Sequence, residues 1–358
     1  MAAATSVVPA FYCPVPEAVH PAGDAVEARA RTWMAEQQLA GSAAASVGIG
    51  VGQFLARCYP YCRREEYLDI AAALNYLGFV FDDAHVSESG LRTCAGLAPV
   101  VGRLLAVLDA PEATVTNPYQ RALQHIVRRI DAVTTPANAA AVADGLRKAL
   151  LYTLWHMSNW ERGEMPSLND YITIRINDDG APWFNAFAPV CGEYQLPPTA
   201  ARDPRIRALD QAVALAAGID NDIYSFPRED AVGQKNILHI LMRDHDCSLH
   251  EATLLAVDLR NRVMHLYARL RDQVTEEADP ATARYTQDIG HIVRGNLQWS
   301  HTTARYRSQP ADAPLITTAE SRGIDPTPLP LPAAAWWWAQ LPTISHQRRP
   351  ADPPVPTT

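Results

Sequence analysis

The pattern of hydrophobic and polar positions predicts α-helices along most of this chain, from about Ala25 onward. Alanine, leucine, arginine and glutamate are abundant, and the alternation with β-branched residues that is typical of strands is scarce. The segment Glu65–Phe81 is apolar nearly all round, which is expected of a helix buried inside a bundle. Further helices are predicted at Tyr119–Val133, Asn138–Trp160, Arg205–Tyr224, Leu249–Val274 and Ala281–Tyr306.

Prolines mark the breaks between these helices and divide the chain into three parts. We expect an N-terminal arm at residues 1–24, one α-helical domain at residues 25–309 and a tail at residues 310–358. Eleven of the 28 prolines lie in this tail, so it is predicted to be extended rather than a packed helix. Its tryptophan cluster, Trp336–Trp338, is expected to dock on the surface of the bundle or, alternatively, to form a flap over a cavity.

The amino-acid composition limits the kinds of molecule that the protein is expected to bind. Of the 358 residues, 48% are hydrophobic and 20% are charged, as expected of a globular protein with an ample core. The formal net charge of −8 argues against nucleic acid or an anionic membrane as the principal partner, so an anionic ligand would need local arginines or bound metal. The sequence shows no membrane span and no signal peptide, and a cytoplasmic location is expected. The six cysteines match neither a disulfide framework nor a zinc site.

Asn221, Ser225 and Glu229 form the most informative chemical pattern in the sequence. Each step of four residues turns only about 40° around a helix, so all three side chains share one face. An amide oxygen, a hydroxyl and a carboxylate stacked over two turns make an oxygen-only ligand set, which suits Mg²⁺ rather than zinc. The spacing therefore predicts a magnesium site on this helix.

A second acidic cluster follows an apolar run and begins with Asp82 and Asp83. Two adjacent acids at the end of a helix are also typical of a solvated helix tip. The apolar run from Ala71 to Phe81 and the partner cluster make metal binding the favoured interpretation. Two oxygen clusters far apart in sequence, each ending a hydrophobic helix, indicate a cavity whose mouth holds several divalent cations.

These patterns resemble the motifs of the class I terpene synthases, and of the bacterial terpene cyclases in particular. The resemblance runs from about Phe11 to Tyr306 and rests on four ordered motifs. They are the NDxxSxxxE motif (Asn221, Asp222, Ser225, Glu229), the start of an aspartate-rich motif (Asp82, Asp83), the Arg-Tyr pair (Arg305, Tyr306), and Arg175, which lies 46 residues before Asn221, where the family has its diphosphate-sensing arginine.

The resemblance implies an all-α fold, a single helical bundle with a central active-site cavity. It implies an enzyme that ionises a linear isoprenoid diphosphate and cyclises the carbocation to a terpene hydrocarbon or alcohol. Three Mg²⁺ ions are implied, bound by Asp82 on one wall and by Asn221, Ser225 and Glu229 on the other. The leaving diphosphate carries about three negative charges, so its electrostatic stabilisation is the main catalytic task.

The aspartate-rich motif departs from the common DDxxD form, because position 86 is valine. His85 or Glu88 could complete the metal site, although Glu88 lies two positions beyond the place of a plain DDxxE motif. Asp83 is a candidate metal ligand. The favoured interpretation, however, is that its carboxylate pairs with an arginine, and Arg305 is the usual partner in the family.

The resemblance also implies how ionisation is triggered. Arg175 is the expected sensor, Asp178 the linker, and Asp179 or Gly180 the effector whose carbonyl points at the developing cation. These residues lead into the sequence Asp-Gly-Ala-Pro, which ends at Pro182. A helix that breaks there frees backbone carbonyls inside the bundle.

The remaining substrate contacts are expected to be basic and aromatic. The diphosphate is also expected to contact Arg228, Arg305 and Tyr306, with solvation at the surface as the alternative for Arg228. Aromatic faces stabilise carbocations by cation–π attraction, and a purely structural role is the alternative for each ring. The four candidate rings are Phe79, one turn before Asp82, Trp299, two turns before Tyr306 on an expected common helical face, and Trp183 and Phe184 after the helix break.

Two other functions are compatible with these residues. A chain-elongating prenyl transferase shares the fold and the metal chemistry but carries two aspartate-rich motifs, whereas the second site here is Asn/Ser/Glu. An isoprenoid-binding protein without catalysis is supported only by the imperfect first motif. The small or polar Asn75 and Gly78 leave room in the cavity, so C20 geranylgeranyl diphosphate is favoured over C15 farnesyl diphosphate. A homodimer is left open.

Overall fold

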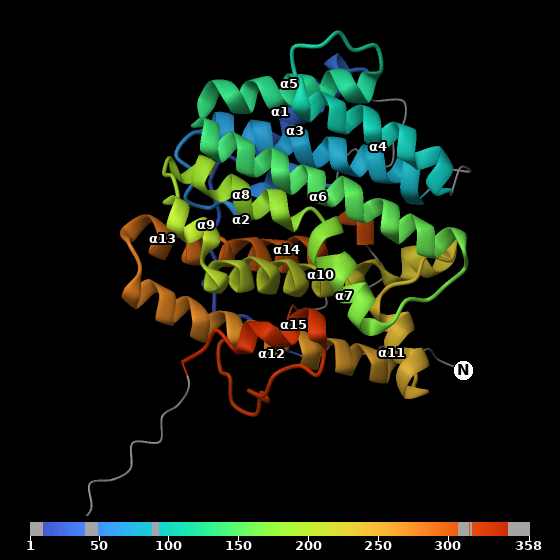
Figure 1. Ribbon diagram of the computed structural model, residues 1–358, viewed down its shortest axis with the longest axis vertical. Coiled ribbons are helices and arrows are strands. Elements are labelled where there is room, and N and C mark those ends of the chain that lie inside the picture. Colours follow the sequence, from blue (N-terminus) through green and yellow to red (C-terminus); the bar gives the residue numbers. More distant parts are fainter. Residues whose placement is uncertain (1–9, 40–48, 88–92, 307–314, 316, 343–358) are drawn as a thin grey trace, which may run out of the picture.

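The computed structural model describes residues 10–39, 49–87, 93–306, 315 and 317–342. Within them the chain forms α-helices and a single pair of short strands (Figure 1). The helices are α1 (Gly23–Glu36), α2 (Val51–Cys58), α3 (Glu65–Asp82), α4 (Cys94–Asp109), α5 (Pro118–Val133), α6 (Pro136–Glu161), α7 (Leu168–Asp178), α8 (Ala181–Gly192), α9 (Pro198–Arg202), α10 (Pro204–Val232), α11 (Ile237–His245), α12 (Leu249–Glu277), α13 (Pro280–Asp288), α14 (Gly290–Thr302) and α15 (Pro332–Trp338). The other elements are a π-helical turn η1 (Asp83–Ser87), a 3-10 turn η2 (Ala304–Tyr306) and the strands β1 (Phe11–Tyr12) and β2 (Thr317–Thr318).

Proline and a capping side chain start several of these helices. A proline in the first turn costs little, because its missing N–H would have no partner within the helix there. The preceding side chain then accepts a hydrogen bond from a free backbone N–H of that turn. This arrangement opens α5 (Asn117, Pro118), α6 (Thr135, Pro136), α10 (Asp203, Pro204) and α13 (Asp279, Pro280).

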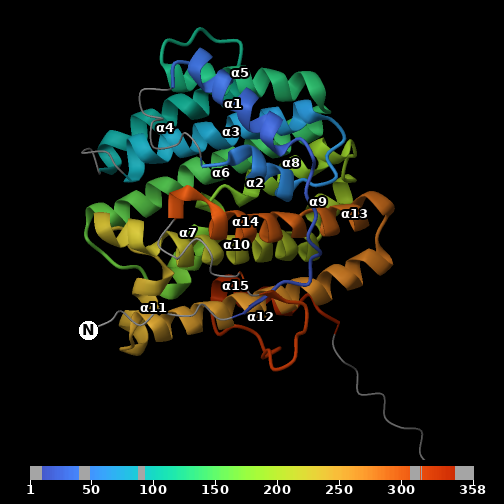
Figure 2. The same cartoon turned by 180° about the vertical axis from the view of Figure 1, so that it is seen from behind.

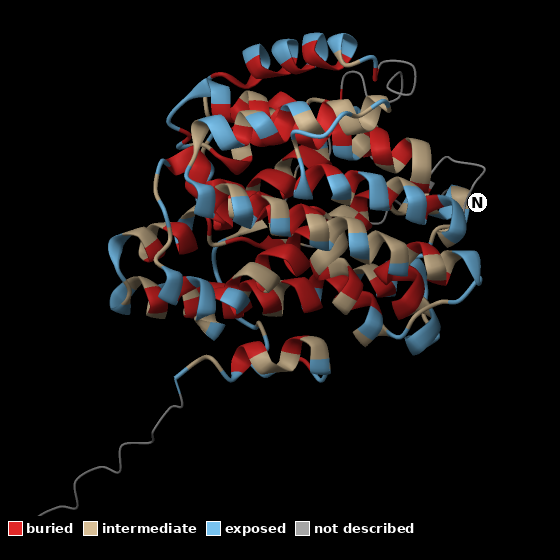
Figure 3. Ribbon diagram, turned by 45° about the horizontal axis from the view of Figure 1, so that its top comes forward, coloured by how far each residue is buried: buried red, intermediate tan, exposed pale blue. Residues whose placement is uncertain are grey.

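The helices pack in layers around a common interior (Figures 1 and 2). Helices α1, α3, α4 and α5 lie at the top of the view, α2, α6 and α8 in the middle, and α10, α12 and α14 below. α6 packs against α4, α7 and α8, and α10 packs against α12, α14 and α7. Buried residues line the inner faces of these helices, and exposed residues the outer faces (Figure 3). The predicted all-α bundle is confirmed.

One predicted helix is divided and ends early. The stretch expected to run to Tyr306 is split at Ile289 into α13 and α14, and α14 ends at Thr302. Thr303 has extended backbone angles (φ −65°, ψ 143°), and its hydroxyl donates to the carbonyl of Ile49 at 2.9 Å. A side-chain contact with a segment some 250 residues away thus stops a helix that the local pattern would continue.

The prediction of an extended tail is wrong for Pro332–Trp338, which form α15. This helix lies on the outside of the bundle against α7 and α10 (Figure 1). Trp337 is fully buried, and its indole N–H donates to Gln211 Oε1 at 2.9 Å. Because alanines and tryptophans follow the proline, the segment can form a short helix and bury its rings. No residue of α15 borders the cavity described below. Residues 343–358 lie outside the described residues.

Buried polar contacts hold the N-terminal strand behind α10. β1 pairs in parallel with β2. Fully buried Arg260 on α12 donates to the carbonyl of Tyr12 and, through Nε, to Asp220 Oδ1 at 2.9 Å. Asp220 directly precedes Asn221 on α10, so this ion pair fixes the back of the helix whose front carries the predicted metal ligands.

Two further observations concern the class of protein. None of the described helices is long and apolar enough to cross a membrane. All six cysteines are free thiols in the structure.

Asp210 on α10 is a half-buried acid that allows a test of stability against pH. Burial raises its pKa to about 7, although Tyr285 opposes the shift by donating to Asp210 Oδ1 at 2.6 Å. In the unfolded chain an aspartate titrates near pH 4, so between about pH 4 and 7 the folded state binds the extra proton and stability falls as pH rises.

We therefore expect Asp210→Asn to raise the melting temperature by an amount that grows from pH 4 to 7 and stays constant above. Asparagine is neutral at every pH and can still accept the hydrogen bond from Tyr285. Thermal unfolding at pH 4.5, 6 and 8 measures this, with Asp131→Asn at an exposed position as the control. A gain that is equal at pH 4.5 and pH 8 would exclude the buried proton as its cause.

Candidate active site

A cavity of about 510 Å³ lies inside the bundle, with walls from α2 to α8, α10 and α14. One part of its wall is aromatic. Trp299 and Phe54 pack with ring centroids 4.9 Å apart, and Trp183 and Phe184 with centroids 4.0 Å apart. Of the described residues that the sequence assigned to the site, all except Asp83 and the alternative metal ligand His85 border this cavity.

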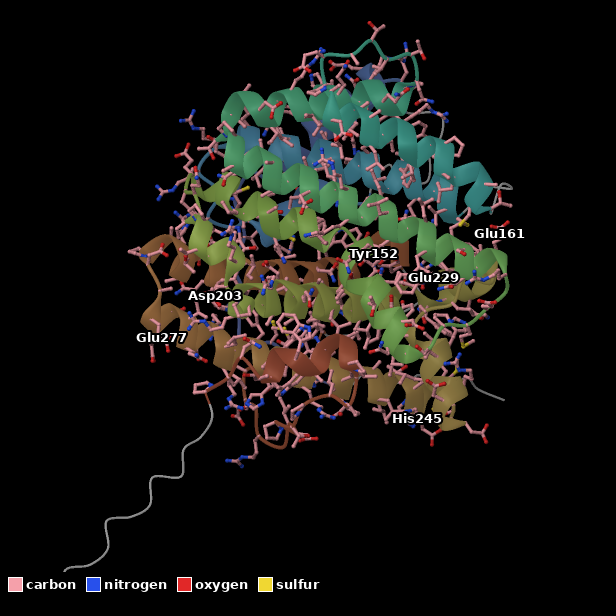
Figure 4. The ribbon with its side chains drawn as sticks, viewed as in Figure 1. Tyr152, Glu161, Asp203, Glu229, His245 and Glu277 are labelled. Atoms are coloured by element: carbon pink, nitrogen blue, oxygen red, sulfur yellow. The ribbon has the colours of Figure 1, made fainter. Side chains whose placement is uncertain are left out.

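Asn221, Ser225 and Glu229 lie on the face of α10 that borders the cavity. Ser225 Oγ donates to Glu229 Oε1 at 2.8 Å, as the shared helical face requires. The second carboxylate oxygen of Glu229 accepts from Asn236 Nδ2 at 2.8 Å. Figure 4 shows Glu229 toward the end of the bundle where α6 ends at Glu161, opposite the end where α10 begins.

At the C-terminal end of α3, the adjacent residues Asp82 and Asp83 have different surroundings. Asp82 borders the cavity, whereas buried Asp83 faces two arginines. Asp83 Oδ1 accepts from Arg228 Nη2 and from Arg305 Nη2, both at 2.7 Å. Burial would raise the pKa of Asp83, but the hydrogen bonds and charges of Arg305 and Arg228 outweigh it and lower the pKa. Asp83 therefore positions the two arginines, in agreement with the pairing favoured from the sequence.

The π-helical turn η1 changes the geometry of the aspartate-rich motif. In a π-helix each N–H bonds to the carbonyl five residues back, so the α-helical spacing of a DDxxD motif does not apply there. Val86 borders the cavity. His85 does not border it, and its ring packs instead on Phe81 and Tyr119, with centroids 5.4 and 5.0 Å apart. Glu88, the other residue considered for this motif, lies outside the described residues.

Arg175 on α7 reaches across to α10. Its Nη2 donates to Asn221 Oδ1 at 2.7 Å and to the carbonyl of Gly218 at 3.2 Å, and lies 2.8 Å from Asp222 Oδ1. A Cβ at position 218 would lie 2.9 Å from Arg175 Cγ, so the glycine makes room for the arginine. Asp178 Oδ1 lies 3.7 Å from Arg175 Nη1. The expected sensor thus contacts the first residue of the metal motif directly.

The predicted helix break is present between α7 and α8. α7 ends at Asp178 and α8 begins at Ala181. Gly180 between them has φ 89°, in the left-handed region that glycine adopts without strain. The carboxylate of Asp179 accepts from the Ala181 N–H at 2.8 Å and so closes the turn. Burial raises the pKa of this carboxyl to about 7.

The break leaves several backbone carbonyls, among them those of Asp178 and Asp179, without their usual helical donors. The carbonyl of Gly180 accepts from the N–H groups of Trp183 and Phe184 at 3.0 and 3.2 Å, so α8 uses it. The donor for Asp178 in a continuous helix would be residue 182, which is a proline. The donor for Asp179 would be Trp183, whose N–H is directed to Gly180. Of the two effector candidates, Asp179 is the one whose carbonyl this geometry leaves without its helical donor.

Arg305 and Tyr306 lie in η2, beyond the end of α14. The expectation that Trp299 and Tyr306 share a helical face is therefore wrong, because the backbone turns extended at residue 303. The two rings meet nevertheless, with centroids 5.6 Å apart. The Tyr306 hydroxyl accepts from Asn221 Nδ2 at 2.8 Å, and the Arg305 guanidinium lies over the Phe79 ring, 4.7 Å from its centroid.

Sequence reasoning missed residues that hold or line this site. His156 on α6 borders the cavity with its Nδ1 3.3 Å from Asp178 Oδ2. Burial would lower the pKa of His156, but Asp178 outweighs it and raises the pKa. Tyr171 donates to Asp222 Oδ2 at 2.6 Å, and Phe54 from α2 borders the cavity. No local motif marks these residues, because each contact joins two different helices.

The donor set on α10 fits a hard divalent cation. Among the described residues, no three His, Cys, Asp or Glu side chains are placed together to hold a metal ion. The α10 set instead mixes amide, hydroxyl and carboxylate oxygens, which Mg²⁺ accepts. Burial, and then the charge of Asp222, raises the pKa of Glu229 to about 7. A cation bound at these oxygens would favour the ionised carboxylate and oppose that shift.

Comparison with known proteins agrees with this geometry. Residues 73–265 match the model of terpene synthase family 2, C-terminal metal binding. The chain is 28% identical to (+)-(1(10)E,4E,6S,7R)-germacradien-6-ol synthase of Streptomyces pratensis, over 93% of this chain and 97% of that protein. It is 30% identical to (+)-T-muurolol synthase of Streptomyces clavuligerus, over 92% of this chain and 81% of that protein.

A solved structure gives the same result for the fold. The crystal structure of the SVS_A2 protein from ancestral sequence reconstruction superposes with a TM-score of 0.82 at 29% identity, covering 94% of this chain and 100% of that chain. The family match extends over both oxygen clusters, and the relatives align over nine-tenths of the chain. The chain therefore belongs to the bacterial class I terpene synthases, lyases that act on prenyl diphosphates and form terpenes.

Proposed function

We propose that this enzyme is a Mg²⁺-dependent terpene cyclase that takes C20 geranylgeranyl diphosphate in preference to C15 farnesyl diphosphate. Its products are a cyclic hydrocarbon or alcohol and diphosphate. The observation that carries the proposal is one cavity with two chemically different ends. Aromatic and aliphatic side chains line its interior, while Asp82, the α10 oxygen set and three arginines gather at its mouth.

The oxygen ligands suit three Mg²⁺ ions held from two walls. Asp82 would bind from α3, and Asn221, Ser225 and Glu229 from α10. When bound, Mg²⁺ acts as a Lewis acid toward the oxygens of the departing diphosphate. Asp83 is left out of this ligand set, because Arg228 and Arg305 occupy its carboxylate.

The protein itself supplies the cationic groups that grip the diphosphate. Arg228 and Arg305 are held side by side by Asp83, and Tyr306 is held by Asn221. Arg175 contacts Asn221 from the opposite side, which supports its role as sensor. Movement of this arginine toward a diphosphate would pull on the α7–α8 turn through Asp178 and Asp179, with the carbonyl of Asp179 as the effector.

The proposed preference for a C20 substrate is supported by the size of the cavity rather than by similarity to the relatives. Relatives include a synthase named as cyclising (2E,6E)-farnesyl diphosphate and another named as a diterpene cyclase. In this chain, Leu74 and Asp82 both border the cavity. They are eight residues apart on α3, about 12 Å at 1.5 Å per residue, so the cavity continues well below the mouth.

The decisive experiment is incubation of the purified protein with C10, C15, C20 and C25 diphosphates and Mg²⁺. Diphosphate release is measured and products are identified by mass spectrometry. We expect a cyclic C20 product as the fastest outcome, and no release in the presence of EDTA. A longer linear prenyl diphosphate would instead identify an elongating transferase. Tight binding without diphosphate release would identify an isoprenoid-binding protein.

The aromatic wall allows a prediction about product control. Phe79 and Trp299 pack with ring centroids 5.8 Å apart and border the cavity. They would touch carbocations formed after ionisation, so Phe79→Leu and Trp299→Leu are expected to change the product profile while diphosphate release persists.

The control for this prediction is Phe187→Leu, which alters a fully buried ring that does not border the cavity. It should lower stability by about 0.5–3 kcal/mol, as core substitutions commonly do, without changing the products. Product ratios and melting temperatures of all three variants are compared. If the profiles of the Phe79 and Trp299 variants match the wild type, both rings are ordinary core.

A further inference from the structure

α3 carries a glycine at position 78 that its packing does not require. Glycine inside a helix costs about 0.5–1 kcal/mol relative to alanine, so an interior glycine calls for a local reason. Close packing is the reason elsewhere in the bundle, because a Cβ at Gly145 or Gly52 would lie 2.6 or 2.3 Å from backbone atoms of a neighbouring segment. A Cβ at Gly78 would meet no atom within 4 Å.

The free space at Gly78 belongs to the cavity. Gly78 borders the cavity and is exposed, although it lies in the middle of a helix whose other positions from Ile70 to Leu77 are all buried. It precedes Asp82 by four residues, so it faces the same side of α3, about 6 Å along the helix from Asp82, which also borders the cavity. The missing side chain therefore widens the cavity just beneath its mouth, where the isoprenoid chain must enter and fold.

We propose that Gly78 is a specificity-determining residue that sets the upper limit of isoprenoid chain length. This inference rests on the proposed cyclase function. A leucine has four more side-chain carbons than glycine, close to the five carbons of one isoprene unit. Gly78→Leu thus fills about the space that separates a C20 substrate from a C15 substrate, while it leaves every charged group of the mouth in place.

The test is a competition assay in which each variant receives equal concentrations of C15 and C20 diphosphates with Mg²⁺. Gly78→Leu is expected to lower the ratio of kcat/KM for C20 to that for C15 by at least about 10-fold, the range that a few carbons command in an apolar pocket. Gly78→Ala, which adds one carbon, should lower the ratio less. A C20-to-C15 ratio that is lowest with leucine at position 78, intermediate with alanine and highest with glycine indicates an effect of side-chain volume.

Gly102→Leu is the matched control. Gly102 also lies inside a helix, α4, and a Cβ there would likewise meet no atom within 4 Å. It is exposed on the surface and does not border the cavity. Both replacements gain the helix propensity of leucine over glycine, so both proteins should fold with unchanged or higher melting temperatures. Gly102→Leu is expected to leave the C20-to-C15 ratio at the wild-type value.

The outcomes separate this inference from the function on which it rests. No diphosphate release by the wild type from any prenyl diphosphate overturns the proposed function. A wild type that converts C20, together with a Gly78→Leu variant whose C20-to-C15 ratio is unchanged, overturns the role of Gly78 alone. Equal loss of both substrates in Gly78→Leu also overturns it, because a chain-length limit acts on the longer substrate first.

Discussion

Glu229→Gln is expected to lower kcat/KM by about 100-fold or more while the protein stays folded. The carboxylate is the only acidic member of the oxygen set on α10 that borders the cavity, and its charge is what a cation there would neutralise. Removing one preorganised electrostatic contact to a developing charge typically costs 10²–10³-fold in rate. Steady-state diphosphate release at several Mg²⁺ concentrations measures the loss.

Glutamine can keep the local hydrogen bonds of Glu229. Its carbonyl can accept from Asn236 Nδ2, and its amide can donate to the Ser225 hydroxyl, which accepts as well as donates. Loss of activity with a melting temperature that is not lowered would thus report the missing charge. Glu276→Gln at an exposed position of α12 is the control for the chemical change alone. Wild-type activity in Glu229→Gln would falsify the metal assignment of this residue.

Arg175→Lys is expected to lower kcat/KM by about 100-fold or more although the positive charge is kept. One guanidinium nitrogen of Arg175 contacts Asn221, Asp222 and Gly218 together, and Nη1 lies 3.7 Å from Asp178 Oδ1, so several acceptors orient the planar group. Lysine is a point charge on a flexible stem and cannot reproduce a planar fork. The kinetics of diphosphate release and the affinity for inorganic diphosphate are the measurements.

A second variant tests the same contact from its other side. Gly218→Ala changes no charge but places a Cβ 2.9 Å from Arg175 Cγ, so it should displace the arginine and lower activity in the same direction. Arg207→Lys at an exposed position near the start of α10 is the control and should leave activity unchanged. Arg175 loses the sensor role if its lysine variant keeps a kcat/KM comparable with the wild type.

The fold was predictable wherever local chemistry decides it. Prolines such as Pro136 mark breaks between helices in the sequence, and in the structure Pro136, preceded by the capping residue Thr135, opens α6. The prediction failed where distant segments meet. Thr303 ends α14 by a contact with Ile49, and α15 forms because its tryptophans find a surface on α7 and α10. Neither contact leaves a trace in local periodicity.

The site, like the fold, has parts that were predictable from the sequence and parts that were not. A regular helical spacing made Asn221, Ser225 and Glu229 readable, and Pro182 revealed the helix break after Asp178. The pairing of His156 with Asp178 depends on how α6 lies against α7, which no single segment encodes. The same holds for the second arginine on Asp83, because Arg228 and Asp83 are 145 residues apart.

The strand pair behind α10 has a consequence for how the enzyme matures during synthesis. The Tyr12 N–H binds Asn261, 249 residues later, and β1 completes its pairing only with β2 at residues 317–318. Contacts over such separations close late, because the entropy of a long loop must be lost first. The strand pair behind α10 can therefore form only after residues 317–318 have been synthesised, whereas the hydrogen bond from Arg260 to the Tyr12 carbonyl can form as soon as Arg260 has emerged. We therefore expect β1 and β2 to pair late in folding, because they lie about 300 residues apart along the chain.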